Sequence, residues 1–439
     1  MSRIPCEMFE TIDKAIDTGY TDTMSLSTDM FKLAGEIREH KELEIPTKKG
    51  FIRKRKLIVP FNVSDLINSI LNTEFEEYEK WINKKVKGKY KREKQIYHIN
   101  YTLKDYNFYY NPRTYYLSIM IKHQELLGNA KFEIMNNIRD IFQNYFGLED
   151  KYLKNLDRAT KLSRIDYKRD HRYKDEQHLS LIKFIVDIAP DGIVGNNYKK
   201  LDERDEHLDI EDFDDIEYMK KYKSSSNKTA EFVIYDKQLE QEDKFRKGKI
   251  TQEELEYFEK VIRFEVRIKN GKLNNLKTYK NWTLDKDIDN YKDENVADEL
   301  FNYYAEQVFF SEPFYRLDVA KRIISESKLP KLSKYNMKDK LRKLLNAINK
   351  NGYTYTQQNY KFSSETFNNH ISILRNELHI NPLTFPTTWT DKEGNTHKTT
   401  YTTIPNFIQM RNCMYDSNEE AIIPSKLREL MEKEKYKWT

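Results

Sequence analysis

Two stretches far apart in the chain share one alternation of apolar and charged residues, and this pattern constrains the fold more than any other feature. One is residues 163–168 (SRIDYK) and the other is residues 262–267 (IRFEVR). Alternate side chains of a strand share a face, so each stretch predicts a strand with an apolar face that packs against helices and a charged face. The charged faces would hold Arg164, Asp166 and Lys168 in the first strand and Arg263, Glu265 and Arg267 in the second. If the strands are neighbours, Asp166 and Glu265 lie close together and offer oxygen ligands to a hard divalent cation, Mg2+ or Mn2+.

The remaining pattern predicts an α+β fold with four parts. Further strands are expected near residues 95–102, 113–121 and 229–236, and helices near residues 130–146, 175–188 and 251–258. Beyond residue 295 the pattern becomes helical. We therefore divide the chain into an N-terminal helical and basic segment (1–90), a body with a mainly antiparallel sheet flanked by helices (91–285), a helical connector (286–334) and a helical, winged-helix-like domain (335–439).

Composition excludes several classes of protein. Only 12 of the 439 residues are Gly, and neither G-x-G-x-x-G nor G-x-x-x-x-G-K-S/T occurs, which excludes a dinucleotide-binding fold and a P-loop motor. No apolar run approaches the roughly 18 residues that span a bilayer. Cys6 and Cys413 are the only cysteines, which excludes a disulfide framework and fits a reducing cytosol. We expect a soluble, cytoplasmic protein with no membrane partner.

Charge is distributed unevenly along the chain, although the net charge is only +5. Residues 48–56 and 84–94 are strongly basic, and the second segment leads into an aromatic tract. Cations that neutralise phosphates beside rings that stack on bases are typical of single-stranded DNA binding. The candidates in this region are Lys84, Lys85, Lys91, Arg92 and Arg113. The alternative is a solvated loop followed by a strand whose inner face carries Tyr115, Leu117 and Ile119.

Acidic residues dominate residues 202–217, and we interpret the region 200–220 as an exposed insertion. Its carboxylates do not follow the order of an EF-hand loop and lack the central Gly, which argues against a calcium site. The role of this insertion is left open.

A third predicted strand, residues 231–237 (EFVIYDK), is followed by Gln238, Leu239 and Glu240. The ordered trio S-R-I-D, I-Y-D-K-x-x-E and R-F-E-x-R-x-K resembles the Rep_trans family of rolling-circle plasmid initiators and the related relaxases of integrative conjugative elements. The resemblance covers residues 95–270; the acidic insertion and the basic N-terminal segment have no counterpart that we can align. It implies that Tyr235 attacks a DNA phosphate, that Asp166 and Glu265 hold the metal ion, and that Glu240 is a further ligand candidate.

The chemistry of tyrosine attack accounts for these residue types. A phenol has a pKa near 10, so attack on phosphorus near neutral pH needs a metal, a base or fixed positive charge. Lys237 is expected to stabilise the phenolate of Tyr235, and Arg267 is expected to clamp the phosphate. The alternatives are that Tyr235 packs in the core, that the carboxylates form ordinary salt bridges with neighbouring arginines, or that Tyr167 is the nucleophile.

The segment after residue 335 predicts a second DNA-binding element. A helix with Leu341, Leu344, Leu345 and Ile348 on one side is followed by an N-cap at Ser363–Ser364, a helix that ends near Leu378 and a hairpin at residues 391–395. This order indicates a winged helix. The groove-facing residues would be Thr366, Asn368, Asn369 and His370, and Lys392 and Lys398 would lie near phosphates. The alternative is a helical subdomain that packs on the body or forms a dimer.

The sequence therefore predicts a DNA strand-nicking and strand-joining enzyme of a mobile element. It would bind origin DNA, both double-stranded and locally single-stranded, and nick one strand through Tyr235 to give a 5'-phosphotyrosine and a 3'-OH primer. It would later religate that strand, and a homodimer would suit this closing step. A host helicase and polymerase are expected partners. The sequence does not distinguish plasmid initiator from conjugative relaxase, and the alternative class is a non-enzymatic winged-helix initiator that binds origin DNA and recruits host factors.

Overall fold

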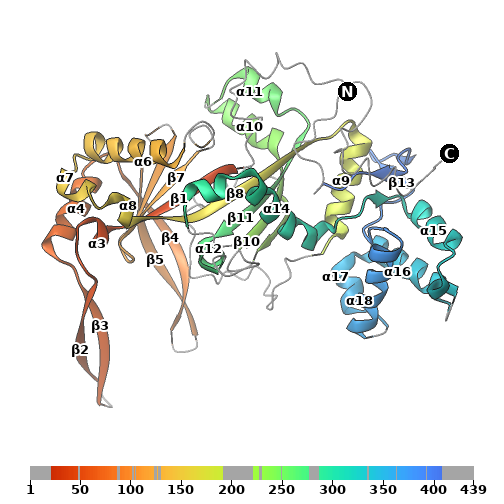
Figure 1. Ribbon diagram of the computed structural model, residues 1–439, viewed down its shortest axis with the longest axis horizontal. Helices are drawn as coiled ribbons and strands as arrows, with labels where there is room; N and C mark the ends of the chain where they lie inside the picture. Colours follow the sequence, from red (N-terminus) through yellow and green to blue (C-terminus); the bar gives the residue numbers. More distant parts are fainter. Residues whose placement is uncertain are drawn as a thin grey trace.

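The computed structural model describes residues 21–47, 50–86, 89–100, 103, 105–122, 126, 130–190, 221–226, 230–248, 250–275, 286–333, 336–361, 363–391 and 393–407. Within these ranges one antiparallel sheet runs through the molecule, with helices against it and a mainly helical region at the C-terminal end (Figure 1). The predicted α+β class with a mainly antiparallel sheet is confirmed. None of the described helices combines the length and the apolar character that crossing a bilayer requires.

The sheet has nine strands in the order β4-β5-β6-β7-β1-β8-β11-β10-β9, and every neighbouring pair is antiparallel. The strands are β1 (Thr21–Asp29), β4 (Glu76–Val86), β5 (Lys89–Asn100), β6 (Tyr106–Asn111), β7 (Tyr116–Ile121), β8 (Thr160–Arg172), β9 (Lys221–Ser226), β10 (Ala230–Asp236) and β11 (Val261–Lys269). Strand β8 is the longest, with 13 residues, and it joins the two halves of the sheet.

Two long β-ribbons extend from the part of the fold that contains β1 and β7 (Figure 1). One consists of β2 (Glu39–Thr47) and β3 (Gly50–Ile58), which pair only with each other. The other consists of the paired strands β4 and β5, whose far end extends beyond the sheet. The described parts of the two strongly basic segments, 50–56, 84–86 and 89–94, belong to the strands of these ribbons.

Short helices cover the half of the sheet that contains β5, β6, β7 and β1 (Figure 1). They are α3 (Met30–Leu33), α4 (Phe61–Leu71), α6 (Lys131–Asp140), which continues as a π-helical turn (Ile141–Tyr145), α7 (Asp150–Leu153) and α8 (Leu156–Ala159). The ring of Phe108 on β6 packs edge-on against Phe142 and Phe146, with ring centres 6.2 and 5.0 Å apart. Such edge-to-face contacts add to the stabilisation from apolar burial.

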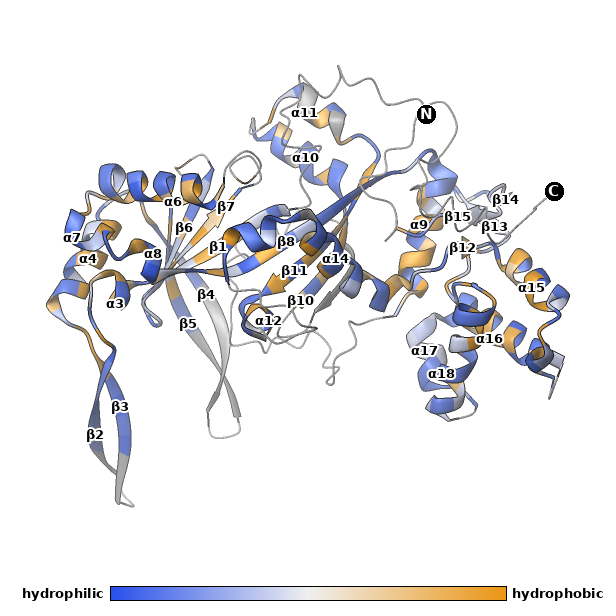
Figure 2. Cartoon of the chain, in the orientation of Figure 1, coloured by the Kyte–Doolittle hydropathy of each residue, from blue (hydrophilic) through white to orange (hydrophobic). Residues whose placement is uncertain are grey.

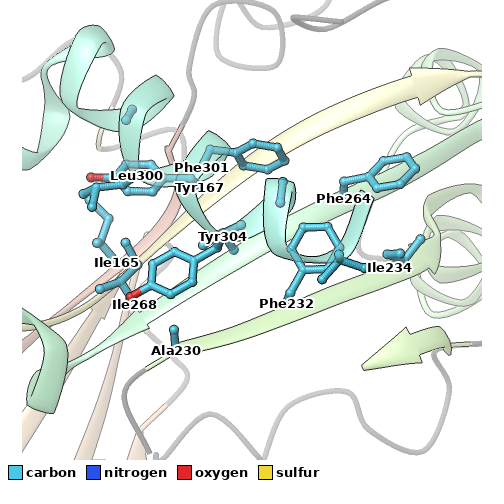
Figure 3. Close-up of a cluster of buried hydrophobic side chains, with 14 of the residues drawn as sticks. Ile165, Tyr167, Ala230, Phe232, Ile234, Phe264, Ile268, Leu300, Phe301 and Tyr304 are labelled. Atoms are coloured by element: carbon cyan, nitrogen blue, oxygen red, sulfur yellow. The ribbon is translucent and has the colours of Figure 1, made fainter. Parts of the chain in front are cut away.

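Helix α14 (Glu294–Phe309) packs on the apolar face of β8, β10 and β11. Asp293 caps it by accepting hydrogen bonds from the backbone N–H groups of Asn295 and Val296. Its buried residues recur at helical spacing, and Figure 3 shows three of them, Leu300, Phe301 and Tyr304, lying over the apolar residues of the strands. The remaining helices around this half are α9 (Glu176–Ile188), α10 (Lys237–Arg246), α11 (Gln252–Tyr257), α12 (Asn270–Asn275) and α13 (Ile288–Lys292).

The C-terminal region contains a helical cluster followed by short strands. Its elements are β12 (Phe314–Tyr315), α15 (Leu317–Glu326), a 3-10 turn (Pro330–Ser333), α16 (Met337–Asn351), α17 (Tyr353–Gln358), α18 (Ser364–Ser372) with a π-helical extension (Ile373–Glu377), β13 (Thr388–Thr390), β14 (Thr396–Lys398) and β15 (Thr403–Ile404). The predicted N-cap is confirmed, because the Ser363 hydroxyl accepts a hydrogen bond from the N–H of Thr366. Strands β13 and β14 form the predicted hairpin. Phe407 stacks on Phe264 of β11 at 4.9 Å, which attaches this region to the sheet.

The structure differs from the sequence-based division at the N-terminus. We expected residues 1–90 to be a separate helical and basic segment, but the described part of it consists largely of strands. Strand β1 lies inside the sheet, between β7 and β8, so residue 90 is not a structural boundary. The acidic insertion at 200–220 lies outside the described residues.

The packing of α14 on the sheet predicts a large loss of stability on cavity formation. Phe232 is 1% exposed and its ring lies 6.3 Å from that of Phe301 and 5.8 Å from that of Phe309. Phe232→Ala should lower the free energy of unfolding by about 3–5 kcal/mol. Phe132→Ala, on a ring that is 74% exposed on α6, is the control and should change it by less than about 0.5 kcal/mol. Urea denaturation measures both, and equal effects would contradict the described packing.

Candidate functional site

The charged faces that the sequence predicts for β8 and β11 are found on one side of the sheet. The two strands are neighbours, and Glu265 stands opposite Lys168 while Arg267 stands opposite Asp166. Strand β10 lies on the other side of β11 and places Tyr235 opposite Arg263. Directly opposed residues of antiparallel strands project to the same face, so the three motif strands contribute to one surface.

Tyr235 lies on this charged face and is bonded to Glu265. Its hydroxyl donates a hydrogen bond to Oε2 of Glu265 at 3.1 Å, and its side chain is 2% exposed. Burial raises the pKa of Tyr235 well above 10, and the negative charges of Glu265 and Glu240 add to this increase. The phenol therefore stays protonated in the free protein, and a reaction at its oxygen requires a base.

Glu265 is the base that the geometry provides. Its Oε1 accepts a hydrogen bond from Nε of Arg267 at 2.6 Å, while its Oε2 faces the Tyr235 hydroxyl. Burial raises the pKa of Glu265, the Arg267 charge opposes this effect, and the nearby negative charge of Asp166 adds to it. Glu265 thus holds a proton more readily than an exposed carboxylate does, and it touches the proton that Tyr235 would lose.

Asp166 lies on the same face but is fully bonded by its neighbours. Its carboxylate accepts hydrogen bonds from Nε and Nη2 of Arg164, at 2.7 and 2.6 Å, and from the hydroxyl of Thr23 at 2.8 Å. The side chain of Asp166 is 2% exposed and that of Arg164 is 7% exposed. The alternative prediction that these carboxylates pair with neighbouring arginines is therefore correct as a description of their contacts, although the pairs are buried and not on the surface.

Strand β1 brings Asp22 to the charged face through an irregularity in its pairing. Thr21 is opposite Tyr167 and Thr23 is opposite Asp166, so Asp22 is the extra residue of a β-bulge. Its carboxylate pairs with Nη1 of Arg263 and lies 3.8 Å from Nζ of Lys168. Burial and the positive charge of Arg263 lower the pKa of Lys168 to about 8.

Arg263 forms the most extensive pairing of the face. Its Nε and Nη2 donate to the two oxygens of Asp170 at 2.7 and 2.8 Å, in addition to the contact with Asp22. The Arg263 side chain is 2% exposed. A buried guanidinium is tolerated only when carboxylates compensate its charge, so these contacts hold β8, β11 and β1 in register around Tyr235.

Glu240 and Lys237 lie at the start of α10, directly after the strand that carries Tyr235. Glu240 pairs with Nζ of Lys237 and with Nζ of Lys244, at 2.5 and 2.6 Å. Burial alone would raise the pKa of Glu240, but the charges of the two lysines outweigh it and lower the pKa to about 2. The Lys237 ammonium also lies 5.8 Å from the centre of the Tyr235 ring. Lys237 therefore lies beside the ring of Tyr235.

The described residues do not form a ready-made set of metal ligands. Among them, no group of three or more His, Cys, Asp or Glu side chains is arranged to hold a metal ion. Asp166 and Glu265 are each bonded to a guanidinium, and Glu240 is bonded to two ammonium groups. Mg2+ or Mn2+ binding by these three residues stays a prediction.

The predicted DNA-binding residues lie away from this face. Lys84 is on β4, Lys91 and Arg92 are on β5, and Arg113 is exposed in the turn between β6 and β7; Lys85 also belongs to β4. On the C-terminal region, Asn368, Asn369 and Lys398 are exposed and Thr366 is partly exposed, whereas Lys392 lies outside the described residues.

His370 was expected to face a DNA groove, and this expectation is wrong. Its side chain is buried on α18, and its Nδ1 lies 2.7 Å from the hydroxyl of Tyr360. Helical spacing places His370 beside Phe367 and Ile371 on the inner side of α18. The exposed side of the helix carries Asn368 and Asn369 instead.

Three residues of the charged face were not singled out as site residues from the sequence. Asp170 continues the alternation of Arg164, Asp166 and Lys168 along β8, so a longer window over that strand would have found it. Asp22 and Thr23 gave no such signal, because they belong to a Ser- and Thr-rich segment and their position depends on a bulge.

Comparison of the chain with models of protein families gave no match. Comparison with curated proteins and with solved structures gave none either. The resemblance to the Rep_trans family therefore stays a prediction from the three short motifs.

The pairing of Arg263 predicts a pH-dependent loss of stability. Asp170→Asn leaves the buried guanidinium without one of its two carboxylates and should lower the free energy of unfolding at pH 7 by about 3 kcal/mol. Burial alone would raise the pKa of Asp170, but the charge and hydrogen bonds of Arg263 hold it below 3.8. The stabilisation is therefore complete above the unfolded-state pKa of 3.8 and is lost as the pH falls through the lower folded-state pKa.

Urea denaturation at several pH values tests whether the Asp170–Arg263 pair stabilises the fold in this pH-dependent way. The difference between wild type and Asp170→Asn should shrink in acid. Asp157→Asn is the control, because it breaks an exposed pair with Arg139 and should cost less than about 1 kcal/mol. If both variants lose the same stability, the charged face does not depend on the Arg263 pairs.

Proposed function

We propose that the protein is a DNA strand-nicking and strand-joining enzyme that uses Tyr235 as its nucleophile. The observation that carries the proposal is the hydrogen bond of 3.1 Å from the Tyr235 hydroxyl to Glu265, on a sheet face lined with arginines and lysines. A phenol, a carboxylate that can accept its proton, and fixed positive charge are the groups that attack on a phosphodiester requires.

The reaction can be written with the residues of this chain. The Tyr235 oxygen attacks the phosphorus and its proton passes to Oε2 of Glu265. The new bond joins the tyrosine oxygen to phosphorus, and the bond from phosphorus to the 3' oxygen breaks. The departing 3' oxygen takes up a solvent proton, so the products are a 5'-phosphotyrosine and a free 3'-OH. The reverse reaction, with Glu265 returning the proton, rejoins the strand.

Arg267 is the residue that we assign to the phosphate. It donates to Glu265 and its side chain is 17% exposed, whereas those of Glu265 and Arg263 are each 2% exposed. Arg267 is therefore the more accessible of the two paired arginines next to Tyr235, and a guanidinium can bind two phosphate oxygens at once. Lys237, above the ring of Tyr235, would stabilise negative charge as it develops on the phenolic oxygen.

Side chains around Tyr235 have to move before a DNA phosphate can react with its hydroxyl. Tyr235 is 2% exposed, so a phosphate reaches its oxygen only after side chains on this face move. The pairs of Arg267 with Glu265 and of Arg164 with Asp166 are the contacts that an incoming phosphate would weaken, because it competes for the same guanidinium groups. We therefore expect free protein to be inactive towards small phosphodiesters that cannot contribute binding energy from distant contacts.

The family resemblance is the only reason to include a divalent cation in the proposal. Mg2+ or Mn2+ would supply charge neutralisation at the phosphate when bound. Asp166, Glu265 and Glu240 remain its proposed ligands. The steps above use only side chains of the chain, and activity in EDTA against activity in each metal decides whether the ion is required.

The C-terminal region is proposed to be a winged-helix domain that binds origin duplex. The order of α16, α17, α18 and the β13–β14 hairpin supports this, as do the exposed Asn368 and Asn369 on α18 and the exposed Lys398 on β14. In this proposal Thr366 and Asn369 read bases while Lys398 contacts phosphate. The bound origin would then deliver one strand to Tyr235, and the free 3'-OH would serve a host polymerase after helicase loading.

Tyrosine attack predicts the result of one substitution. Tyr235→Phe should abolish the denaturant-resistant protein–DNA adduct with a labelled origin strand, because the attacking oxygen is gone, and duplex binding should stay within twofold of wild type. Tyr167→Phe is the matched control on β8, which is separated from β10 by β11, since its hydroxyl donates to the carbonyl of Tyr291 on the opposite face. If Tyr167→Phe lost the adduct while Tyr235→Phe kept it, Tyr167 and not Tyr235 would be the nucleophile. Origin binding without any adduct in wild type would instead favour the non-enzymatic initiator.

The role of Glu265 predicts a pH dependence. Glu265 accepts a proton only when ionised, and burial holds its pKa above the usual 4.5, so nicking should be lost as the pH falls through that raised value. Glu265→Gln should lower the nicking rate by about 100-fold or more and remove the acid limb of the profile. A variant that keeps the acid limb would show that another group supplies the base.

A further inference from the structure

The β2–β3 ribbon stands apart from the sheet and exposes both of its faces. Each strand has nine residues, which is a length of about 30 Å. Figure 2 shows most of the coloured part of the ribbon as hydrophilic. A two-stranded ribbon is marginally stable in water on its own. The exposed side chains of the ribbon are therefore available to contact a binding partner.

The two faces of this ribbon carry different charge patterns. On one face Arg53 pairs with Glu44 at 3.2 Å and Arg55 pairs with Glu42 at 3.5 Å. The other face carries Lys41, Lys54 and Lys56, with Leu43 opposite Lys54 and with Glu39 and Ile58 paired at the base of the ribbon. No ion pair of these three lysines is found within the described residues. Each arginine is therefore paired with a glutamate, whereas the lysine face keeps an excess of positive charge, three lysines against the single carboxylate of Glu39.

The register of the ribbon places like charges opposite each other. Lys41 stands directly opposite Lys56, and such a cross-strand pair destabilises a ribbon. The β4–β5 ribbon has the same feature, because Lys84 stands opposite Lys91. Residues 39–58 contain seven basic and three acidic residues, and residues 76–100 contain eight and four. The two ribbons thus hold more positive charge than the net +5 of the whole chain.

We propose that the lysine face of the β2–β3 ribbon, Lys41, Lys54 and Lys56, binds the phosphate backbone of duplex DNA. A polyanion relieves the repulsion between Lys41 and Lys56 and compensates Lys54 at the same time. A two-stranded ribbon also fits the width of the major groove, so phosphates on either side come within reach of long side chains. The β4–β5 ribbon would form a second arm on the same duplex. This inference deepens the proposed function by assigning it a duplex-holding element far from Tyr235.

The two faces of the ribbon provide a matched experiment. The double variant Lys54→Gln/Lys56→Gln and the double variant Arg53→Gln/Arg55→Gln each remove two positive charges from β3. Arg53 and Arg55 are 74% and 76% exposed, and Lys54 and Lys56 are exposed as well, so neither variant removes a buried contact. Binding of a labelled 30-base-pair duplex is measured over a series of salt concentrations, with circular dichroism and thermal unfolding as checks on folding.

The lysine variant should bind duplex several-fold more weakly, and its slope of log affinity against log salt should be smaller by about 1.8, the value for two lost phosphate contacts. The arginine variant should keep most of the wild-type slope. Equal losses in both variants would overturn the proposal, because they would reflect net charge alone. Unchanged duplex binding with weaker binding to anionic lipid vesicles would overturn it in favour of a membrane surface.

A separate readout distinguishes this proposal from the nicking proposal. Adduct formation on a short single-stranded oligonucleotide depends on Tyr235 and should be unchanged in the lysine variant. If wild type forms no adduct but the lysine variant still loses duplex affinity and salt slope, the ribbon assignment stands and the nicking proposal fails. If adducts form normally and the lysine variant binds duplex like wild type, the ribbon assignment fails alone.

Discussion

The fold around Tyr235 depends on the compensation of buried charge. Arg164, Arg263 and Arg267 would each be costly inside the protein without carboxylates, and each is paired with at least one. The pairs of Arg263 with Asp170 and Asp22 connect β11 to β8 and β1, and the pair of Arg267 with Glu265 leaves one oxygen of Glu265 directed at the Tyr235 hydroxyl. The same network that stabilises the sheet therefore also sets the protonation of its reactive groups.

Much of the fold follows from strand and helix periodicity. The alternation in residues 163–168 and 262–267 is maintained in β8 and β11 because one face packs under α14 and the other faces charged partners. The helix cap at Ser363 and the hairpin at residues 391–395 were also predictable, because both depend on local backbone hydrogen bonds. The proximity of Tyr235 to Glu265 was expected only through the family resemblance, because the residue pattern does not show that β10 lies beside β11.

Other parts depend on tertiary contacts that the sequence does not display. Strand β1 is rich in Ser and Thr and has only a few large apolar residues, yet it lies between β7 and β8, where its neighbours supply the pairing. Asp22 reaches the charged face through a β-bulge, and no residue pattern in the sequence predicts this bulge. The basic segment 84–94 was interpreted together with its aromatic tract as a single-strand binding region, and only the register shows lysines opposite each other, Lys41 with Lys56 and Lys84 with Lys91.

The most direct measurement of the central claim is to locate the attachment point of DNA on the protein. Trypsin releases residues 229–237 (TAEFVIYDK) as a peptide with a single tyrosine. After reaction with an origin strand and nuclease trimming, mass spectrometry should find a nucleotide phosphate on this peptide. A nucleotide on a different tyrosine peptide, or on none while cleavage proceeds, would contradict the account.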